Sequence, residues 1–322
     1  MEEIINLISK RDYSDDFIAI NGTKEKISAN NFRPINKNRE LNFLFVDGGN
    51  AELLKSPDFS LQFVRILGIC RKNGSKTHHL SEFYCFAKTE LKENKKIWKI
   101  KNVFLKGKKI IPKDLAIEDA FQSPSAAAEF VRRLSEIALA ADLSKTLSGN
   151  DVILLDGTLE AGCRTEAEFL LNLHQASKKY GVSLCSLAKT TAMQTSNGNS
   201  IISVFNAFGP KGKWHYQVKK DIPLMFFAKL HENSGYIFKF ETNSEDANFN
   251  QKILGSLASA SKDPVFIGYP FGLIEADRLA RVSNREKGIL KLELAARFGK
   301  LWKDVEKEET ALNAHDILDN IG

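Results

Sequence analysis

The chain has 322 residues, of which 43% are hydrophobic and 27% are charged, and its formal net charge is +6. This composition is typical of a globular protein with a sizeable core, and no apolar run approaches the roughly 18 residues that a membrane-spanning helix needs. The acidic N-terminus lacks the pattern of a secretory signal. The four scattered cysteines contain no C-x-x-C pair and support neither a disulfide framework nor a zinc knuckle. We therefore expect a cytoplasmic protein.

A strand that ends in a carboxylate follows the polar residues 1–40, which we expect to form an N-terminal lead-in. The sequence FLFVDGGN spans residues 43–50 and places Asp47 and two glycines after an apolar run. An Asp-Gly pair is a strong turn signal, but it also exposes a carboxylate beside open backbone. The strand end is therefore either a plain turn or one half of a functional site.

Residues 88–113 follow further strand-like segments and are strongly basic. They contain ten lysines and two glutamates, so the local net charge is ten minus two, or +8. Alternation in KKIWKIKNVFLKGKK favours a pair of strands with a lysine-rich face. Such a face either protects an exposed sheet edge against aggregation or binds the phosphate backbone of a nucleic acid. For the second alternative the candidate residues are Lys96, Trp98, Lys99 and Lys101.

A helical period replaces the strands between about residues 114 and 147, where apolar residues recur on one face. The next strand lies in NDVILLDGTLE at residues 150–160, and it repeats the first design with an aliphatic run, Asp156 and Gly157. Two strands that each end in Asp-Gly would set their carboxylates side by side if they were neighbours in one sheet. Paired carboxylates of this kind hold divalent metal ions.

The remaining elements alternate between helix and strand. Antiparallel strands followed by such an alternation imply a mixed α/β sheet flanked by helices, and the RNase H-like arrangement, with extra strands and helices, fits this order. Residues 190–220 are rich in Ser, Asn, Gly and Lys and are predicted to be a mobile loop. The other predicted elements are a helix over 164–180, a strand ending at Lys189, two strands after the loop, a helix near 247–260, a short strand over 264–270 and a long helix over 273–298.

Five motifs carry a resemblance to a known family. In chain order they are FVDGGN, RRLSE, ILLDGTL, SLAKTTAM and GYPFGLIEADRLARV, and with this spacing the chain resembles the NurA nuclease family over roughly residues 41–290. The resemblance implies a nuclease domain over residues 41–300, with 190–220 as an inserted loop and 301–322 as a C-terminal tail. It also implies a DNA nuclease with an RNase H-like core that is usually a homodimer and works beside the hexameric ATPase HerA.

The activity implied by this resemblance is hydrolysis of phosphodiester bonds in DNA end resection and double-strand break repair. The enzyme would be a metal-dependent deoxyribonuclease, acting as a 5′–3′ exonuclease and/or a single-strand endonuclease with Mn²⁺ or Mg²⁺. Two divalent ions about 4 Å apart would activate the attacking water and stabilise the leaving oxygen. Three or four carboxylates are the ligands that such a pair of ions needs.

The metal ligands that the resemblance implies are carboxylates. Asp47 matches the first metal carboxylate of the family, and Asp156 matches its later strand carboxylate. The helical glutamate of the family is best matched by Glu136, with Glu129 as the rival. Alternatively, both glutamates belong to an exposed salt-bridged stripe, because they and the arginines between them are spaced at i, i+3, i+4 and i+7.

The last motif departs from the family, because Asp277 stands eight residues after Tyr269, where the family has a histidine. Aspartate binds a hard cation through oxygen but cannot act as a neutral imidazole ligand. Asp277 could instead pair with Arg281 four residues later, and Tyr269 could be an aromatic plug at a strand end. Lys189 would neutralise a phosphate or simply reach solvent. The resemblance therefore implies Asp47, Glu136, Asp156, Tyr269, Asp277 and Lys189 as catalytic residues, with Asp47, Glu136, Asp156 and Asp277 as metal ligands.

Two other functions stay open at this point. Asp-Gly at strand ends also holds magnesium-ATP in the actin-like kinase fold, although the duplicated domain and glycine-rich adenosine site of that class are not evident in the sequence. A nucleic-acid-binding subunit derived from a nuclease, without catalysis, would agree with the departure at Asp277. A nucleotide-binding assay and a DNA cleavage assay with manganese would separate the three functions.

Overall fold

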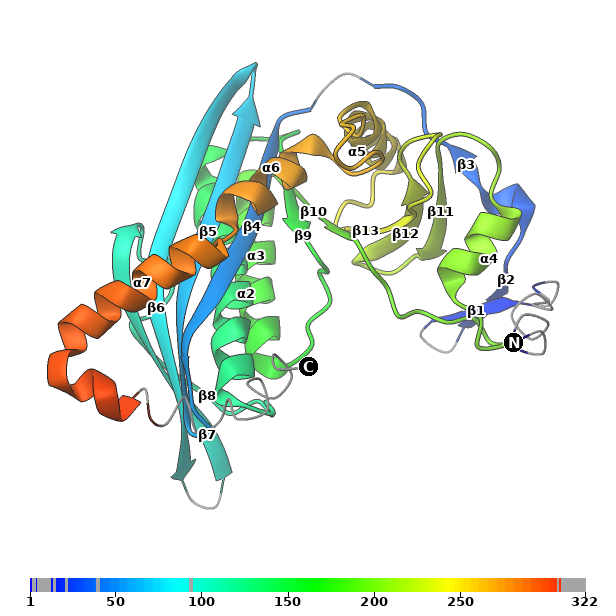
Figure 1. Cartoon of the computed structure of the whole chain (residues 1–322). Helices are drawn as coiled ribbons and strands as arrows, with labels where there is room; N and C mark the ends of the chain where they lie inside the picture. Colours follow the sequence, from blue (N-terminus) through cyan, green and yellow to red (C-terminus); the bar gives the residue numbers. More distant parts are fainter. Residues whose placement is uncertain are drawn as a thin grey trace. The chain divides into compact units, whose positions relative to one another are not determined.

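The computed structural model describes residues 1, 4, 13, 16–20, 23–38, 41–92, 95–305 and 307. The chain divides into two compact units, whose elements are labelled in Figure 1. Among the described residues, no helix combines the length and the hydrophobicity that spanning a lipid bilayer requires. Unit 1 comprises Met1–Leu41, Asp156–Leu159 and Ser183–Phe271, and unit 2 comprises Asn42–Leu155, Glu160–Val182 and Gly272–Gly322.

Unit 2 is built on a mixed β-sheet with the strand order β9-β4-β5-β6-β7-β8. Strands β4 and β9 are parallel, and the other neighbours pair antiparallel. This is the order expected when an antiparallel meander is followed by a helical crossover back to the first strand. The strands are β4 (Phe43–Lys55), β5 (Phe59–Lys72), β6 (Ser75–Lys92), β7 (Lys95–Gly107), β8 (Asp114–Ile117) and β9 (Val152–Asp156).

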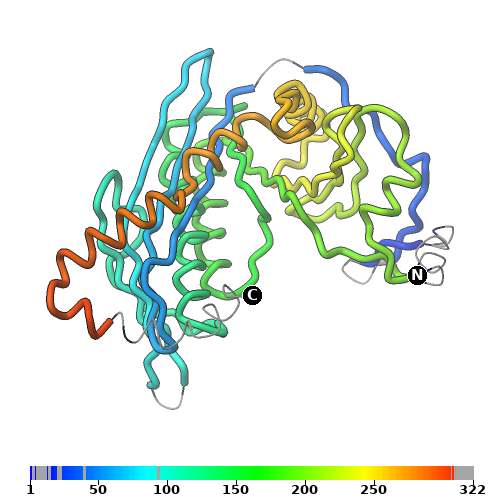
Figure 2. The backbone as a smooth tube through the Cα atoms, in the orientation of Figure 1, coloured from blue at the N-terminus to red at the C-terminus, as the bar shows by residue number. Residues whose placement is uncertain are grey.

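Helices cover both faces of the unit 2 sheet. Helix α2 (Pro124–Leu143) packs on β4 and β5 from one face, and α3 (Arg164–Tyr180) packs against α2. Helices α6 (Phe271–Ala280) and α7 (Asn284–Phe298) lie on the opposite face (Figure 1). Figure 2 shows how α6 leads into α7 as the chain crosses this face. The mixed sheet flanked by helices that the sequence predicted is therefore present.

Helix α2 begins later than the sequence analysis expected. Residues Asp114–Ile117, predicted as the start of a helix, form β8 and pair antiparallel with β7. The helix instead starts at Pro124, whose fixed backbone angle suits the first helical turn. The Ser123 side chain accepts a hydrogen bond from the Ala126 N–H at 3.2 Å and so caps the helix.

The long helix predicted over residues 273–298 is two helices. The backbone leaves the helical conformation at residues 281–283, and the Ser283 side chain then caps α7 by accepting from the Glu286 N–H at 3.1 Å. The short strand predicted over residues 264–270 is absent from the described structure, where this segment forms turns. The local signal for the break in the helix is the capping residue Ser283. The signals against the strand are the prolines at its two ends.

Unit 1 contains a second set of strands, in the order β3-β11-β12-β13-β10, and a separate hairpin of β1 and β2. The described part of the expected lead-in forms β1, β2 and β3, and the expected loop over 190–220 holds α4 and β11. The elements are β1 (Phe17–Ile20), β2 (Thr23–Lys26), β3 (Arg33–Pro34), β10 (Ser183–Ala188), α4 (Ile201–Phe208), β11 (Trp214–Lys219), β12 (Leu224–Lys229), β13 (Phe238–Thr242) and α5 (Ala247–Ser259).

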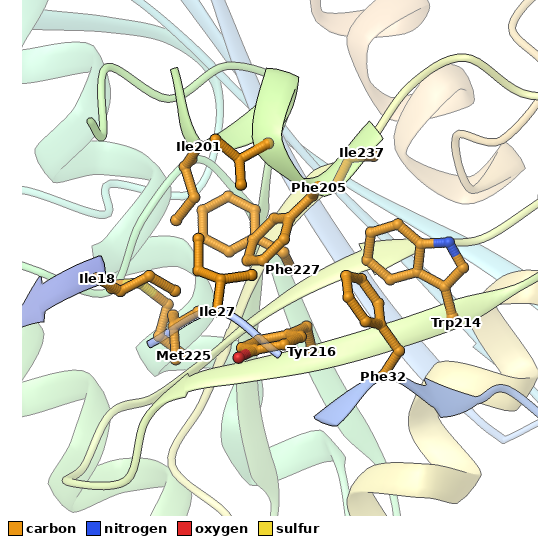
Figure 3. Packing of buried hydrophobic residues seen from close by; sticks show 12 residues of the cluster. Ile18, Ile27, Phe32, Ile201, Phe205, Trp214, Tyr216, Met225, Phe227 and Ile237 are labelled. Atoms are coloured by element: carbon orange, nitrogen blue, oxygen red, sulfur yellow. The ribbon is translucent and has the colours of Figure 1, made fainter. Parts of the chain in front are cut away.

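An aromatic core explains why these two segments are structured. The Phe32 ring packs edge-on against Phe205 of α4 and against Trp214 and Tyr216 of β11, with ring centroids between 4.7 and 5.7 Å apart. Figure 3 shows these side chains pointing toward one another together with Ile18, Ile27 and Ile201. Short apolar runs within a polar composition thus bury enough surface to order both segments.

Two successive glycines let helices approach β4 closely on both faces. A Cβ added at Gly48 would lie 2.7 Å from Glu136 Oε1 of α2, and a Cβ added at Gly49 would lie 2.3 Å from the Ala280 carbonyl oxygen of α6. Both distances are shorter than a Cβ atom tolerates. The glycines therefore allow the contacts by which α2 and α6 reach the same stretch of strand.

We expect the Gly49→Ala substitution to lower the free energy of unfolding by about 1–3 kcal/mol, because the α6 backbone must shift to admit the methyl group. Urea unfolding followed by circular dichroism measures this change. Gly288→Ala in α7 is the matched control, since nothing lies within 4 Å of its added Cβ, and it should leave stability unchanged or raise it by up to about 1 kcal/mol. Equal unfolding curves for the two variants would contradict the close packing of α6 on β4.

Candidate functional site

Two aspartates follow the last register pair of the parallel strands. The register of β4 and β9 runs from Phe43↔Val152 to Val46↔Leu155. Asp47 is the next residue of β4, and Asp156 is the final residue of β9. The predicted pairing of the two Asp-Gly strands is confirmed, and it is parallel. The expected strand end at Asp47 is wrong, because β4 continues through the two glycines to Lys55, whereas β9 does end at Asp156.

Asp47 is held close to its own backbone. The carboxylate is almost buried, with 6% of the residue exposed, and Oδ1 accepts a hydrogen bond from the Gly48 N–H at 2.8 Å. Because side chains alternate along a strand, Asp47 shares the face of Gly49, on which α6 lies. The next two positions carry no side chains, and groups of α2 and α6 fill the space beside them.

Glu136 reaches the same stretch of β4 from α2. The residue is 3% exposed, and its carboxylate pairs with Arg132 and, at 3.6 Å, with Arg133. Arg132 also donates to the Gly48 carbonyl oxygen at 3.1 Å, which ties the helix to the strand. The rival Glu129 is exposed. Two arginines compensate the buried charge of Glu136, as a buried carboxylate requires, so the residue is not part of a solvent-exposed stripe.

Asp156, Lys189 and Tyr269 are brought together in unit 1. Lys189 Nζ donates to Asp156 Oδ2 at 2.7 Å, and the Tyr269 hydroxyl donates to Asp156 Oδ1 at 3.1 Å. The ammonium of Lys189 also lies 5.2 Å from the centre of the Tyr269 ring, within cation–π range. Both oxygens of the Asp156 carboxylate are therefore oriented by side chains that the resemblance had pointed to.

An open pocket of about 450 Å³ adjoins this trio within unit 1. Its polar lining consists of Asp156, two lysines and three threonines, and the remaining lining residues are alanines and a glycine. One of the lysines, Lys239 of β13, was missed by the sequence analysis. The polar lining residues are Asp156, Thr158, Lys189, Thr190, Thr191 and Lys239.

A buried carboxylate, Glu241, stands behind this pocket. The residue is 0% exposed and accepts hydrogen bonds from Thr158 Oγ1, Leu159 N, Ser186 Oγ and Lys239 Nζ at 2.7–3.0 Å. Burial alone would raise the pKa of Glu241, but the charge of Lys239 and the hydrogen bonds from Leu159, Lys239 and Thr158 lower it below the ordinary value. The same carboxylate thus fixes Lys239 and the turn that follows Asp156.

Asp277 lies on α6 and pairs with Arg281. The Arg281 Nη2 to Asp277 Oδ2 distance is 2.9 Å, and 38% of the Asp277 side chain is exposed. This is the i, i+4 ion pair that the sequence allowed as an alternative to a site role. On the buried side of α6, Glu275 pairs with Arg71 of β5 at 2.6 Å and Lys76 of β6 at 2.7 Å, which anchors the helix that carries Asp277.

The basic strands expose lysines and bury the tryptophan. Alternation along β7 places Lys99 and Lys101 on the exposed face, where they line an open pocket of about 600 Å³ with Lys88. Lys96 Nζ lies 4.4 Å from the Trp98 ring centre. Trp98 itself is 1% exposed, and its indole N–H donates to the Asp119 carbonyl oxygen at 3.1 Å. Trp98 therefore belongs to the core and cannot stack on a base, which corrects its selection as a contact residue.

Three of the four predicted carboxylate ligands are ion-paired in the described structure. Among the described residues, no group of three or more His, Cys, Asp or Glu side chains is arranged to hold a metal ion. Instead, Glu136, Asp156 and Asp277 each pair with a basic side chain of their own unit. The carboxylate oxygens match the hard-donor preference of Mg²⁺ and Mn²⁺, so the donor chemistry fits such an ion.

Comparison with solved structures identifies the fold as RNase H-like. The crystal structure of the NurA nuclease from Sulfolobus solfataricus is similar over 94% of this chain and 93% of that chain, with a TM-score of 0.56 and 15% sequence identity. Marinitoga piezophila Argonaute with guide RNA and target DNA matches 76% of this chain and 30% of its own at a TM-score of 0.30 and 11% identity. No family model and no curated protein sequence matches the chain. The resemblance to NurA is therefore confirmed at the level of the fold.

Acid should weaken the anchoring of α6 through Glu275. Burial alone would raise the pKa of this carboxyl, but Lys76 and Arg71 lower it below its ordinary value of 4.5. A lowered pKa in the folded state stabilises the fold above the ordinary pKa, and this contribution is lost as the pH falls through the folded-state pKa. We therefore expect the wild type to lose more free energy of unfolding between about pH 6 and about pH 3 than Glu275→Gln does. Urea unfolding at several pH values measures the difference, and parallel profiles would contradict it.

Proposed function

We propose that this chain is a divalent-metal-dependent DNA nuclease that hydrolyses phosphodiester bonds. One observation carries the proposal: the parallel register of β4 and β9, after which Asp47 and Asp156 are the next residues of their strands. Parallel neighbours in this register place the two residues at matched positions of adjacent strands. The likeness in fold to the NurA nuclease supports the same reading.

Carboxylates that the sequence singled out would hold Mn²⁺ or Mg²⁺. Asp47, Glu136 and Asp156 are the core of the proposed ligand set, and Asp277 is its fourth member. Glu136 reaches β4 at Gly48, the residue after Asp47, from the α2 side of the strand. When bound, one or two such ions would lower the pKa of the attacking water and stabilise the leaving oxygen.

The chain's own groups would orient the reacting strand. Lys189 is already positioned by Asp156 and by the Tyr269 ring, so its ammonium can neutralise a phosphate without first losing much side-chain freedom. The Tyr269 hydroxyl would keep the Asp156 carboxylate in one orientation. Lys189 and Tyr269 thus act on the phosphate and on the ligand geometry, respectively.

Nucleic acid would also contact the lysine-rich face of unit 2. Lys96, Lys99 and Lys101 are exposed on β7, and clustered cations attract a phosphate backbone without demanding a base sequence. With the metal site, this face fits DNA as the substrate. We further propose a role in DNA end resection and double-strand break repair in the cytoplasm, as a homodimer beside a HerA-type hexameric ATPase.

A nucleic-acid-binding subunit without catalysis is the second candidate function. The observation that favours it is the ion pairing of Glu136, Asp156 and Asp277 with basic side chains, because a paired carboxylate must exchange its partner to bind a metal. The two functions differ in whether DNA is cut, so one cleavage assay separates them.

We expect the purified chain to cut single- or double-stranded DNA with Mn²⁺ or Mg²⁺ and to lose all activity in EDTA. Asp47→Asn should abolish cleavage with a nearly unchanged thermal melt, since the amide keeps the shape of the carboxylate but not its charge. Gel electrophoresis of end-labelled DNA measures both effects. Retained cleavage by Asp47→Asn would remove Asp47 from the site, and no cleavage by the wild type with either ion would favour the binding subunit.

The two glutamates of α2 provide a matched pair of variants. Glu136→Gln should slow cleavage by about a hundredfold or more, because a metal ligand contributes several kcal/mol to the transition state. Glu129→Gln changes the same residue type on an exposed turn of the same helix and should cleave at the wild-type rate. The rates are compared at saturating Mn²⁺ after both variants pass a thermal melt. Equal rates would assign Glu136 a structural role with Arg132.

A further inference from the structure

The pocket beside Asp156 has the chemistry of an anion site. It is open, its volume of about 450 Å³ lies within the range of small-ligand sites, and its donors are the ammonium groups of Lys189 and Lys239 and the hydroxyls of three threonines. No aromatic side chain is among the described residues that line it. A phosphate group, which accepts charge-assisted hydrogen bonds on several oxygens, fits this lining better than a base does.

Lys239 is fixed in place more firmly than a solvent-reaching lysine. Its side chain is 12% exposed, and Nζ donates to Glu241 Oε1 at 2.9 Å and to Thr158 Oγ1 at 3.2 Å. Glu241 lies behind it, fully buried and bound by three further donors. The ammonium group of Lys239 therefore faces the pocket, and the Glu241 carboxylate that balances its charge is buried away from water.

Preorganisation of this kind is what a binding group requires. Holding a long side chain in one position removes the entropy cost that a mobile lysine would pay on binding. An alternative role for Lys239 is purely structural, as the counter-ion that allows Glu241 to stay buried beneath the turn after Asp156. The two roles differ in one respect. Only in the binding role does the affinity for a nucleic acid strand depend on the charge of Lys239.

We propose that this pocket binds a phosphate group of the nucleic acid strand next to the phosphate that is cleaved, with Lys239 as its principal ligand. The inference rests on the proposed nuclease function, because Asp156 lines the same pocket and would sit between the two phosphates. The pocket then sets the register of the strand, since a second fixed phosphate decides which bond lies at the metal-binding carboxylates.

The test measures binding apart from cleavage, by fluorescence anisotropy of a short single-stranded DNA in EDTA. Lys239→Met should weaken binding by about tenfold, the loss of one charge-assisted contact. It should also lower the slope of log affinity against log salt by about 0.7, which is one phosphate contact on a single strand. Lys262→Met, an exposed lysine of unit 1 outside the pocket, is the control and should leave the affinity within about twofold of wild type.

Stability is controlled by a second variant. Lys239→Met leaves Glu241 buried without its counter-ion, whereas Lys239→Met combined with Glu241→Gln removes both charges and avoids an unpaired buried carboxylate. The double variant should show the same loss of affinity and of salt slope. Lys239→Arg, which keeps the charge, should recover part of the affinity.

Neutral methylphosphonate links, placed one at a time along the DNA, locate the contact. For the wild type, one position should cost about tenfold in affinity, and for the Lys239 variants that same position should cost nothing further. Strands with a 5′-phosphate or a 5′-hydroxyl distinguish a terminal from an internal phosphate in the pocket. Unchanged affinity and slope in the variants, or a methylphosphonate profile that does not depend on Lys239, would overturn the proposal.

Failure of the proposed function has a different signature. One outcome is that the wild type does not cut DNA with Mn²⁺ or Mg²⁺, but a methylphosphonate at one position lowers the affinity only when Lys239 is present. This outcome supports the phosphate pocket and refutes the nuclease function. If DNA is cut but no methylphosphonate position depends on Lys239, the nuclease function is supported and Lys239 is only the counter-ion of Glu241.

Discussion

The parallel pairing of β4 with β9 is the constraint on which the rest of the structure depends. A parallel neighbour cannot be reached by a tight turn, so the chain must cross back over the sheet after the antiparallel strands β5 to β8. Helix α2 makes that crossover, and its passage over β4 brings Glu136 to Gly48. The strand register places Asp47 and Asp156 at matched positions of adjacent strands, and the crossover brings Glu136 to β4 at the residue after Asp47.

Charge balance is the second theme of the candidate site. Three carboxylates in and around the site have a basic partner within their own unit: Arg132 for Glu136, Lys189 for Asp156, and Lys239 for Glu241. These pairs hold the acids in defined positions at a tolerable cost of burial. They also mean that any cation entering the site competes with an ammonium or guanidinium group, and that a displaced lysine is already next to the place where a phosphate would arrive.

Much of the fold could be read from the sequence because its signals are local and strong. The two aliphatic runs ending in Asp-Gly predicted a pair of neighbouring strands, and the alternation in β7 predicted an exposed lysine face. Where apolar runs are short and lie in polar surroundings, as in α4 and β11, composition concealed elements that long-range packing on Phe32 stabilises. Lys239 and Glu241 escaped notice because FKFET reads as an ordinary strand. Their partners come from β10 and from the turn after β9, which the sequence of FKFET does not show.

The double glycine after Asp47 has a consequence for how this sequence can vary. Positions 48 and 49 face opposite sides of β4, and each meets an oxygen of a different helix within the space of one Cβ atom. At Gly48 the close atoms belong to side chains, those of Glu136, Ile66 and Arg132, whereas at Gly49 they belong to the α6 backbone at Ala280 and Arg281. A larger residue at position 48 therefore asks side chains to repack, but one at position 49 asks α6 itself to move, so Gly49 fixes how near this helix lies to the strand that carries Asp47.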